Sequence, residues 1–256
     1  MRGFLLVGLF CFLASCGGSD PEAPASRAAG GVPRFGDADP HDWEGVKPWQ
    51  YSVHGIDVSK YQGDIDWWAA RSGGISFAFI KATEGGDYAD ERFAENWAGA
   101  AAAGVPRGAY HFYYFCRTAA EQAEWFMQHV PADRRALPPV LDIEWNHKSR
   151  TCPYRPDAET VRSEMYDYLQ TVARYYGKRP IIYTTVDFYR ENELWRIRDY
   201  HFWLRSVAGH PSEVYSGQDW AFWQYTGTGL VSGISGLTDI NVFAGSPAQW
   251  AQWAYN

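Results

Sequence analysis

Short apolar runs alternate with amphipathic helical patterns along the chain from Tyr51 onward. Runs of about four to eight apolar residues between turn-forming residues are typical of buried strands. Eight runs fit this description, at residues 53–58, 76–81, 108–115, 139–145, 180–184, 201–205, 221–225 and 239–243. A regular alternation of strands with helices predicts an α/β protein built as a β/α barrel.

Helices are predicted between the strands of the first half of this pattern. Residues 91–103 form one candidate, which Gly104 and Pro106 would stop, and Thr118-Ala119-Ala120-Glu121 is a capping box that opens another. Asp157 can cap a long helix that ends before Gly177. Later segments such as 226–238 are short and rich in glycine. We therefore expect eight strands with fewer than eight helices.

The N-terminus has the pattern of an export signal. Arg2 precedes an apolar run at 4–13, which is too short to span a membrane. The run ends in Leu13-Ala14-Ser15-Cys16, which resembles the lipobox of bacterial lipoproteins, although ordinary cleavage in the same region is the alternative. We expect a lipid anchor at Cys16, and a soluble, unlipidated mature protein would contradict it. Since Gly17 rather than aspartate follows Cys16, we expect the periplasmic face of the outer membrane.

Composition sets the expected domain organisation. Residues after the signal and up to about 50 are rich in glycine, serine, proline and alanine, which is typical of a flexible tether. We expect a signal peptide at 1–15, a tether at 16–50 and one folded domain at 51–256. The chain of 256 residues is 46% hydrophobic and 17% aromatic, enough for a substantial core, and its net charge of −7 argues against a nucleic-acid partner.

Two of the four cysteines remain outside the signal and the proposed lipid site. In an exported protein, leftover cysteines most often pair, and Cys116 and Cys152 each follow one of two successive predicted strands. We expect them to form a disulfide between neighbouring loops. Neither has the spacing of a metal ligand, so no metal site is predicted.

Carboxylates recur at the ends of the predicted strands. Asp142 and Glu144 are two residues apart at the end of one run, so in a strand they would share a face with Cα atoms roughly 7 Å apart. Asp57 and Asp239 lie at one rim of the same predicted barrel. Such acids can be helix caps and turn formers. Four acids that converge would instead raise the pKa of at least one, as two-carboxylate glycoside hydrolysis requires.

These residues sit in motifs that resemble the lysozymes of glycoside hydrolase family 25, the Chalaropsis-type N-acetylmuramidases. The motifs run in order along the chain: Gly55-Ile56-Asp57-Val58-Ser59, Ile80-Lys81-Ala82-Thr83-Glu84-Gly85, Gly108-Ala109-Tyr110-His111-Phe112, Leu141-Asp142-Ile143-Glu144, Tyr183-Thr184, Trp223-Gln224-Tyr225 and Asp239-Ile240-Asn241. The resemblance implies an irregular, flattened barrel that hydrolyses the β-1,4 bond after N-acetylmuramic acid in peptidoglycan, without a cofactor.

The resemblance also implies roles for single residues. Glu144 would be the general acid, and Asp142 either the nucleophile or the group that orients the substrate's own N-acetyl oxygen. Asp57 and Asp239 would tune proton affinity and hold substrate. His111 is expected to be an interior residue rather than a catalytic base. The residues expected to bind the sugar rings are Tyr110, Tyr183, Trp223 and Tyr225, with Glu84 as a further match of open role.

Two departures from the family pattern concern the groove. Arg205 stands where the family usually has a small residue, so the charge or width of the groove on that side is expected to differ. The segment 146–156 lengthens the loop beside the catalytic pair. Two other functions remain open: hydrolysis of another N-acetylglucosamine polymer such as chitin, and wall binding without catalysis. Val140 stands where a chitinase would carry a third acid. A monomer is expected.

Overall fold

A sheet that closes on itself forms the centre of the molecule in this computed structural model, which describes residue 1 and residues 35–146 and 149–255. Eight strands make the ring, in the order β2-β3-β5-β6-β7-β8-β9-β10, and β10 returns to pair with β2. Their bounds are β2 His54–Val58, β3 Ile75–Glu84, β5 Arg107–Phe112, β6 Val140–Asp142, β7 Ile181–Thr184, β8 His201–Arg205, β9 Phe222–Leu230 and β10 Thr238–Phe243, with β1 Gly36–Asp37 and β4 Tyr88–Ala89 paired outside the ring. Each of the eight predicted runs is one of these ring strands, which confirms the predicted barrel.

The strand β10 runs against both of its neighbours. It pairs antiparallel with β9 and with β2, whereas β2, β3, β5, β6, β7, β8 and β9 pair parallel to one another around the rest of the ring. The start of β10 therefore lies at the rim where the parallel strands end. Its second residue, Asp239, stands directly opposite Asp57 in the register with β2.

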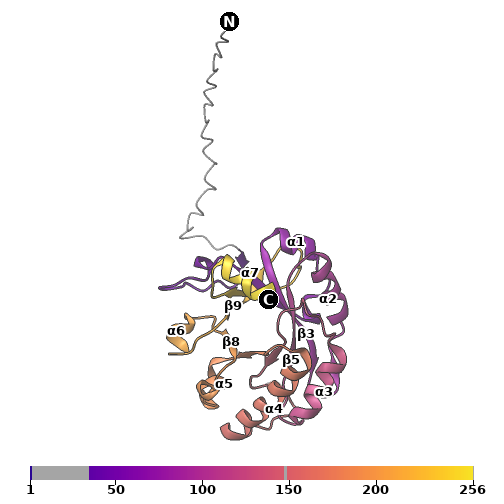
Figure 1. The fold of residues 1–256 in the computed structure, drawn as a ribbon. Helices are drawn as coiled ribbons and strands as arrows, with labels where there is room; N and C mark the ends of the chain where they lie inside the picture. Colours follow the sequence, from indigo (N-terminus) through magenta and orange to yellow (C-terminus); the bar gives the residue numbers. More distant parts are fainter. Residues whose placement is uncertain (2–34, 147–148, 256) are drawn as a thin grey trace.

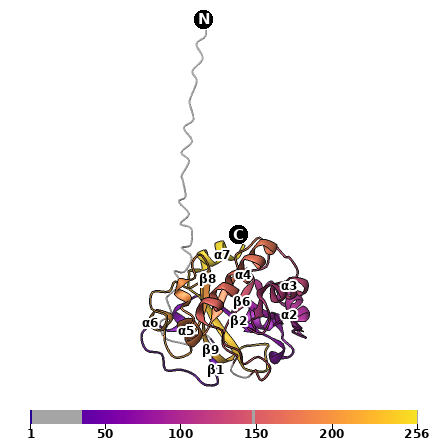
Figure 2. The ribbon, with the colours of Figure 1, turned by 90° about the horizontal axis from the view of Figure 1, so that it is seen from below.

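The helices are distributed unevenly around the barrel. Figure 1 shows α1 to α4 following one another along one side, and Figure 2 shows α5 and α6 on the other. The bounds are α1 Trp67–Ser72, α2 Phe93–Ala102, α3 Ala119–His129, α4 Ala158–Tyr176, α5 Val186–Glu191, α6 Pro211–Val214 and α7 Pro247–Tyr255. Within the described residues there are thus fewer than eight helices, as predicted.

The predicted helix boundaries have the expected physical basis. Thr118 and Glu121 form the capping box of α3, in which the Thr118 hydroxyl accepts from the Glu121 N–H and the Glu121 carboxylate accepts from the Thr118 N–H. The Asp157 carboxylate accepts two backbone N–H bonds at the start of α4, and Gly177 ends that helix in the left-handed conformation at φ 66°. Side-chain caps thus satisfy donors that the first turn leaves free.

The helix α7 closes the end of the barrel opposite the rim where the parallel strands end. Its Trp250 ring packs 5.1 Å from the ring of Phe77, which together with Phe79 fills the barrel interior. A Cβ on Gly55 would lie 2.4 Å from the Phe77 ring, so only glycine leaves room for this aromatic packing. The interior is therefore a packed floor, and the opposite rim is left to form the site.

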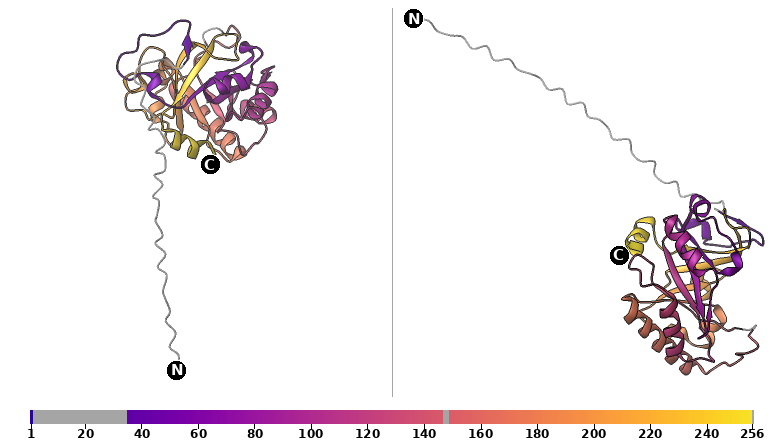
Figure 3. Two further views of the ribbon diagram at one scale, coloured as in Figure 1. Left: turned by 90° about the horizontal axis from the view of Figure 1, so that it is seen from above. Right: turned by 90° about the vertical axis from the view of Figure 1, so that its right-hand side faces the viewer.

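The segment 35–50 packs on the outside of the barrel, so the prediction that it belongs to a flexible tether is wrong. Its β1 pairs with β9, and Trp43 is 6% exposed with its ring 5.1 Å from that of Trp223. Figure 3 shows this indigo segment beside the strands near the end of the chain. It covers a face of β9 and β10 that none of the helices in the described residues covers, because the chain passes directly from β9 to β10.

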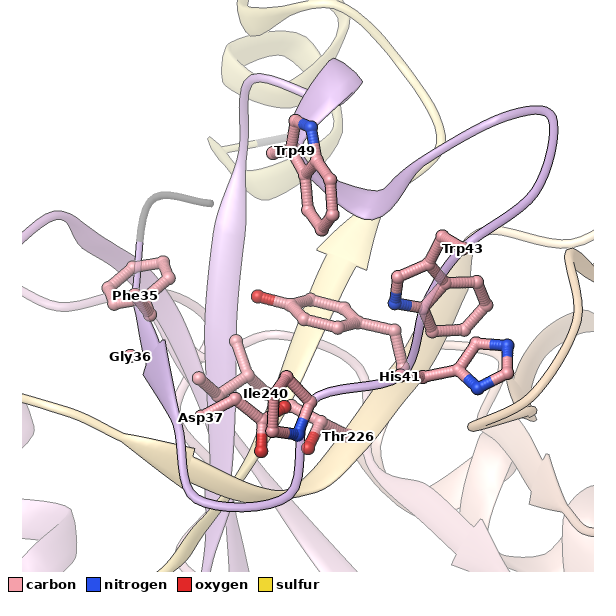
Figure 4. Close-up of a pocket in the computed structure, with 10 residues that line it drawn as sticks. Phe35, Gly36, Asp37, His41, Trp43, Trp49, Thr226 and Ile240 are labelled. Atoms are coloured by element: carbon pink, nitrogen blue, oxygen red, sulfur yellow. The ribbon is translucent and has the colours of Figure 1, made fainter. Parts of the chain in front are cut away.

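A small pocket of about 130 Å³ remains between this segment and the barrel. Figure 4 shows Phe35, Trp43 and Trp49 around it, from the segment, with Ile240 from β10 below. Aromatic and aliphatic carbon makes up most of its wall, as at an ordinary packing interface.

The predicted signal at 1–15, Cys16 and the first part of the predicted tether lie outside the described residues. The lipid anchor therefore stays a prediction. Among the helices of the described residues, none combines the length and the apolar composition needed to cross a lipid bilayer.

Candidate active site

A cavity of about 680 Å³ opens at the rim where the parallel strands end. This volume is in the usual range for a small-molecule site, and the rim is where β/α barrels place their chemistry. All four predicted acids line it. The lining residues are Asp57, Tyr110, Asp142, Glu144, Trp145, Tyr183, Thr185, Val186, Asp187, Arg190, Trp203, Arg205, Gln224 and Asp239.

The backbone around β6 directs Asp142 and Glu144 into the same cavity. Asp142 is the last residue of β6, so Glu144 follows the strand rather than lying within it. The extended pairing nevertheless continues, because Ile143 N–H donates to the Tyr183 carbonyl at 3.0 Å. Ile143 points away into the core, fully buried. Alternation thus places the two carboxylates on the side opposite Ile143, as the sequence predicts.

Two side-chain amides hold the carboxylate of Asp57. The Nε2 of Gln224 and the Nδ2 of Asn241 both donate to Asp57 Oδ2, at 3.0 and 2.8 Å. These amides are fixed in turn, since Tyr183 donates its hydroxyl to the Gln224 carbonyl at 3.0 Å and the Trp203 indole donates to that of Asn241 at 2.7 Å. Every member of this network is buried or lines the cavity, so Asp57 has a fixed orientation.

Burial raises the pKa of three of the acids, and repulsion by a neighbouring carboxylate adds to the effect at two of them. Burial raises the pKa of Asp57 well above its ordinary range, and the negative charge of Asp239 adds to this effect. Burial, then the neighbouring Glu144, likewise raises the pKa of Asp142. Burial raises the pKa of Asp239 to about 6, against the opposing effect of Arg205. The cavity therefore favours protonated carboxyl groups at pH values where exposed acids are ionised.

This arrangement fits acid–base hydrolysis of a sugar bond. It offers several carboxyl groups with unequal proton affinity in one cavity, with the rings of Tyr110, Tyr183 and Trp203 in its wall. Among the described residues, no cluster of three or more histidine, cysteine or acidic side chains is arranged to hold a metal ion.

Comparisons with known proteins agree with this chemistry. The model of the family "Glycosyl hydrolases family 25" matches residues 56–234, which is most of the chain. The chain belongs to glycosyl hydrolase family 25. It is similar to Lysozyme M1 of Streptomyces globisporus, at 38% identity over 212 residues that cover 80% of this chain and 72% of that protein.

Solved structures of family 25 share the barrel. A family 25 glycosyl hydrolase from Bacillus anthracis superposes with a TM-score of 0.76 at 34% identity, over 86% of this chain and 99% of that one. A bacterial lysozyme from Streptomyces coelicolor superposes with a TM-score of 0.70 at 36% identity, over 79% of this chain and 97% of that one. The protein is therefore a glycoside hydrolase with the family 25 fold.

Within this family 25 site, the predicted sugar-binding residues divide into two groups. Tyr110 and Tyr183 line the cavity, whereas Trp223 and Tyr225 do not. Trp223 is fully buried, and its indole donates to the Ser206 carbonyl at 2.7 Å, so it cannot stack on a sugar. Both rings lie on the outer face of β9, under the segment 35–50. The prediction that they contact substrate is wrong, because strand alternation turns Gln224 inward instead.

Glu84 and His111 have structural partners. Glu84 pairs with Lys81 at 2.5 Å and accepts from the Tyr114 hydroxyl at 2.6 Å. Burial raises the pKa of Glu84, but Lys81 and Tyr114 together leave it below its ordinary value. His111 is fully buried between Thr83 and Gln122, and burial lowers its pKa to about 4, so it is neutral at pH 7. This agrees with its predicted interior place.

Gln224, Asn241 and Trp203 are among the residues of the family 25 site that the sequence did not identify as site residues, whereas Arg205 was expected only to alter the groove. Gln224 and Asn241 both stood inside the quoted motifs. Gln224 lies two residues after the inward-facing Phe222, and Asn241 lies two residues after Asp239, so strand alternation would have identified both. Trp203 and Arg205 likewise alternate along β8 with both side chains toward the cavity. The signal available was strand periodicity rather than residue type.

The predicted disulfide between Cys116 and Cys152 is present, with Cα atoms 5.7 Å apart. It ties the segment that follows β5 to the loop after Glu144. Within that loop the guanidinium of Arg155 lies 4.8 Å from the ring of Trp145, which lines the cavity. The loop tied by the disulfide thus packs behind Trp145, which is a wall residue of the site.

Proposed function

We propose that this enzyme is a lysozyme, an N-acetylmuramidase that hydrolyses the β-1,4 bond between N-acetylmuramic acid and N-acetylglucosamine in peptidoglycan. The observation that carries the proposal is the convergence of Asp57, Asp142, Glu144 and Asp239 on one cavity of a family 25 barrel. The names of the relatives, among them Lysozyme M1, support peptidoglycan as the substrate class.

In this proposal Glu144 donates its proton to the glycosidic oxygen as the bond to the anomeric carbon breaks. The leaving sugar departs with that proton, and the anomeric carbon receives an oxygen from the opposite face. A water molecule, deprotonated by Glu144, later completes hydrolysis and restores the acid. The rings of Tyr110 and Tyr183, which line the cavity, form the wall on which a sugar face can pack.

Two roles fit Asp142, which is 8% exposed and whose Oδ1 has no hydrogen-bond partner in the described structure. The carboxylate can attack the anomeric carbon directly. Alternatively, Oδ1 can accept the N–H of the substrate's N-acetyl group and aim its carbonyl oxygen at that carbon. A substrate with an N-trifluoroacetyl group separates the roles, because its electron-poor carbonyl slows only attack by the substrate itself.

Digestion of purified peptidoglycan by wild type, Glu144→Gln and Glu124→Gln tests the proposal. New reducing ends are reduced with borohydride and identified by mass spectrometry. We expect reduced N-acetylmuramic acid from wild type and from Glu124→Gln, whose exposed side chain lies on α3. Loss of the general acid in Glu144→Gln should lower the rate by roughly 100-fold or more.

Other products would identify the alternatives. Reduced N-acetylglucosamine at the new ends would keep the hydrolase and refute the bond specificity. Cleavage of chitin oligomers but not of peptidoglycan would make the enzyme a hydrolase of another N-acetylglucosamine polymer. Wall binding without cleavage by wild type would leave a binding protein only.

A further inference from the structure

Arg205 brings a positive charge into a cavity lined mainly by acids. The lining contains five carboxylates and two guanidinium groups, those of Arg190 and Arg205. One guanidinium nitrogen of Arg190 donates to the Val214 carbonyl at 2.9 Å, which ties this side chain to the end of α6. Arg205, one of the two positions where the sequence was expected to depart from the family pattern, is the last residue of β8.

The backbone of Arg205 is fixed while its guanidinium keeps its donors. The Arg205 carbonyl accepts the Tyr215 hydroxyl at 2.6 Å, and its strand pairs it with Gln224 of β9. Within residues 35–146 and 149–255, no salt bridge or hydrogen bond engages the guanidinium itself. The positive charge is nevertheless close enough to lower the pKa of both Asp57 and Asp239. The group is thus held near the acids with its N–H donors available.

An anionic ligand would be repelled by this cavity unless a cation met its charge. A guanidinium offers two parallel N–H donors that match a carboxylate, and such charge-assisted pairs are roughly twice as strong as neutral hydrogen bonds. In peptidoglycan, the lactyl group of N-acetylmuramic acid carries a carboxylate, which is free where the stem peptide has been removed and becomes a neutral amide where the peptide is attached.

We propose that Arg205 binds the free lactyl carboxylate of muramic acid and makes the enzyme prefer glycan strands stripped of their stem peptides. This inference rests on the proposed lysozyme function and specifies the substrate of that same cavity. Arg205 lies two residues along β8 from Trp203, whose ring packs 4.5 Å from that of Tyr183, so the charge lies beside the sugar-binding wall. A sugar packed on that wall would present its lactyl group to the guanidinium.

Binding measurements test this without relying on cleavage. The full chain carrying Glu144→Gln is titrated with a tetrasaccharide of alternating N-acetylglucosamine and N-acetylmuramic acid with free carboxylates, and with its methyl ester, while tryptophan fluorescence is recorded. The ligands differ in the charge of the lactyl group and in one added methyl group. We expect the free acid to bind roughly tenfold more tightly than the ester.

Further variants in the Glu144→Gln background attribute that preference. Arg205→Ala should abolish the preference for the free acid over the ester by weakening binding of the acid alone. Arg205→Lys should keep part of this preference, since lysine retains the charge but not the paired donors. Arg198→Ala, at an exposed position that does not line the cavity, is the control and should keep this preference in full. A preference that shrinks as salt increases would add support.

The inference would be overturned by equal affinity for acid and ester, by a preference that survives Arg205→Ala, or by no binding of either ligand. Equal weakening of both ligands by Arg205→Ala would show a structural role and would overturn it as well. The proposed function is judged separately, by whether wild type cleaves peptidoglycan. A wild type that cleaves without preferring the acid refutes only the role of Arg205.

Discussion

Asp239 shows at the level of one residue how the site opposes stability. Its carboxyl group is largely buried opposite Asp57, and burial raises its pKa to about 6 in the folded chain, whereas in the unfolded chain an aspartate titrates near 3.9. Below about pH 4 both states hold the proton, and the neutral group costs nothing. As the pH rises from about 4 to 6 only the unfolded state loses the proton, so the free energy of unfolding falls.

Asp239→Asn should therefore stabilise the protein at pH 7 but not at pH 4. A pKa difference of about two corresponds to roughly 3 kcal/mol, which is the largest gain we expect. Urea unfolding at the two pH values measures it, and peptidoglycan digestion should show reduced activity in the same variant. Asp219→Asn, at an exposed position, is the control and should change neither. An equal gain at both pH values would refute the electrostatic explanation.

The sequence predicts which acids form the site better than it predicts the face of a strand from which a side chain projects. The sequence predicts that four acids share a cavity, because residues at the ends of barrel strands lie at one rim. These acids are Asp57, Asp142, Glu144 and Asp239. The sequence does not reveal that Trp223 faces outward, because tryptophan suits either a groove or a core. Only the face of each strand, which the tertiary pairing decides, separates these possibilities.

Among the elements, strands and capped helices follow directly from local patterns, whereas their pairing does not. The capping box at Thr118 and the glycine at 177 act within one turn, so sequence alone locates the ends of α3 and α4. The direction of β10 depends on the hairpin with β9 and on its partner β2, which lies far away in sequence. Asp239 reaches the predicted rim through an antiparallel strand rather than at the end of a parallel one.

The disulfide between Cys116 and Cys152 links two elements around the catalytic rim. Replacing both cysteines with serine should lower the free energy of unfolding by about 4 kcal/mol, because the bond closes a loop across 36 residues. We also expect lower activity under native conditions, since the loop that follows Glu144 loses its attachment to β5. Thermal unfolding and digestion rates, with and without reductant, measure both effects.

Reductant provides the control for this pair. It should lower the stability of wild type toward that of the double variant and leave the double variant unchanged. If the double variant is as stable as wild type but less active, the disulfide positions the loop at the site without stabilising the fold. Unchanged stability and activity would refute both expectations.

For the molecule as a whole, the barrel is completed by a segment that composition predicts to be a tether. The run from Phe35 to Gln50 is rich in polar and turn-forming residues, and it is attached to the barrel by the short pairing of β1 with β9 and by isolated aromatics such as Trp43. Hydrophobic periodicity therefore could not identify it as part of the fold. It buries Trp223 and Val242 on the face that lacks a helix, so the folded unit includes residues well before Tyr51.

Trp43→Ala should consequently destabilise the whole barrel. Removal of a buried tryptophan typically costs about 3 to 5 kcal/mol, and this ring contacts that of Trp223 beneath it. Trp68→Ala is the matched control, since that ring is 63% exposed and should contribute less than about 0.5 kcal/mol. Urea unfolding of the full chain measures both.

At temperatures where both variants are folded, their cleavage rates should equal that of wild type, because Trp43 packs on the outer face of β9 while the cavity opens on the inner face. Equal stability of the two variants would show that the segment 35–50 contributes nothing measurable to the free energy of unfolding of the barrel.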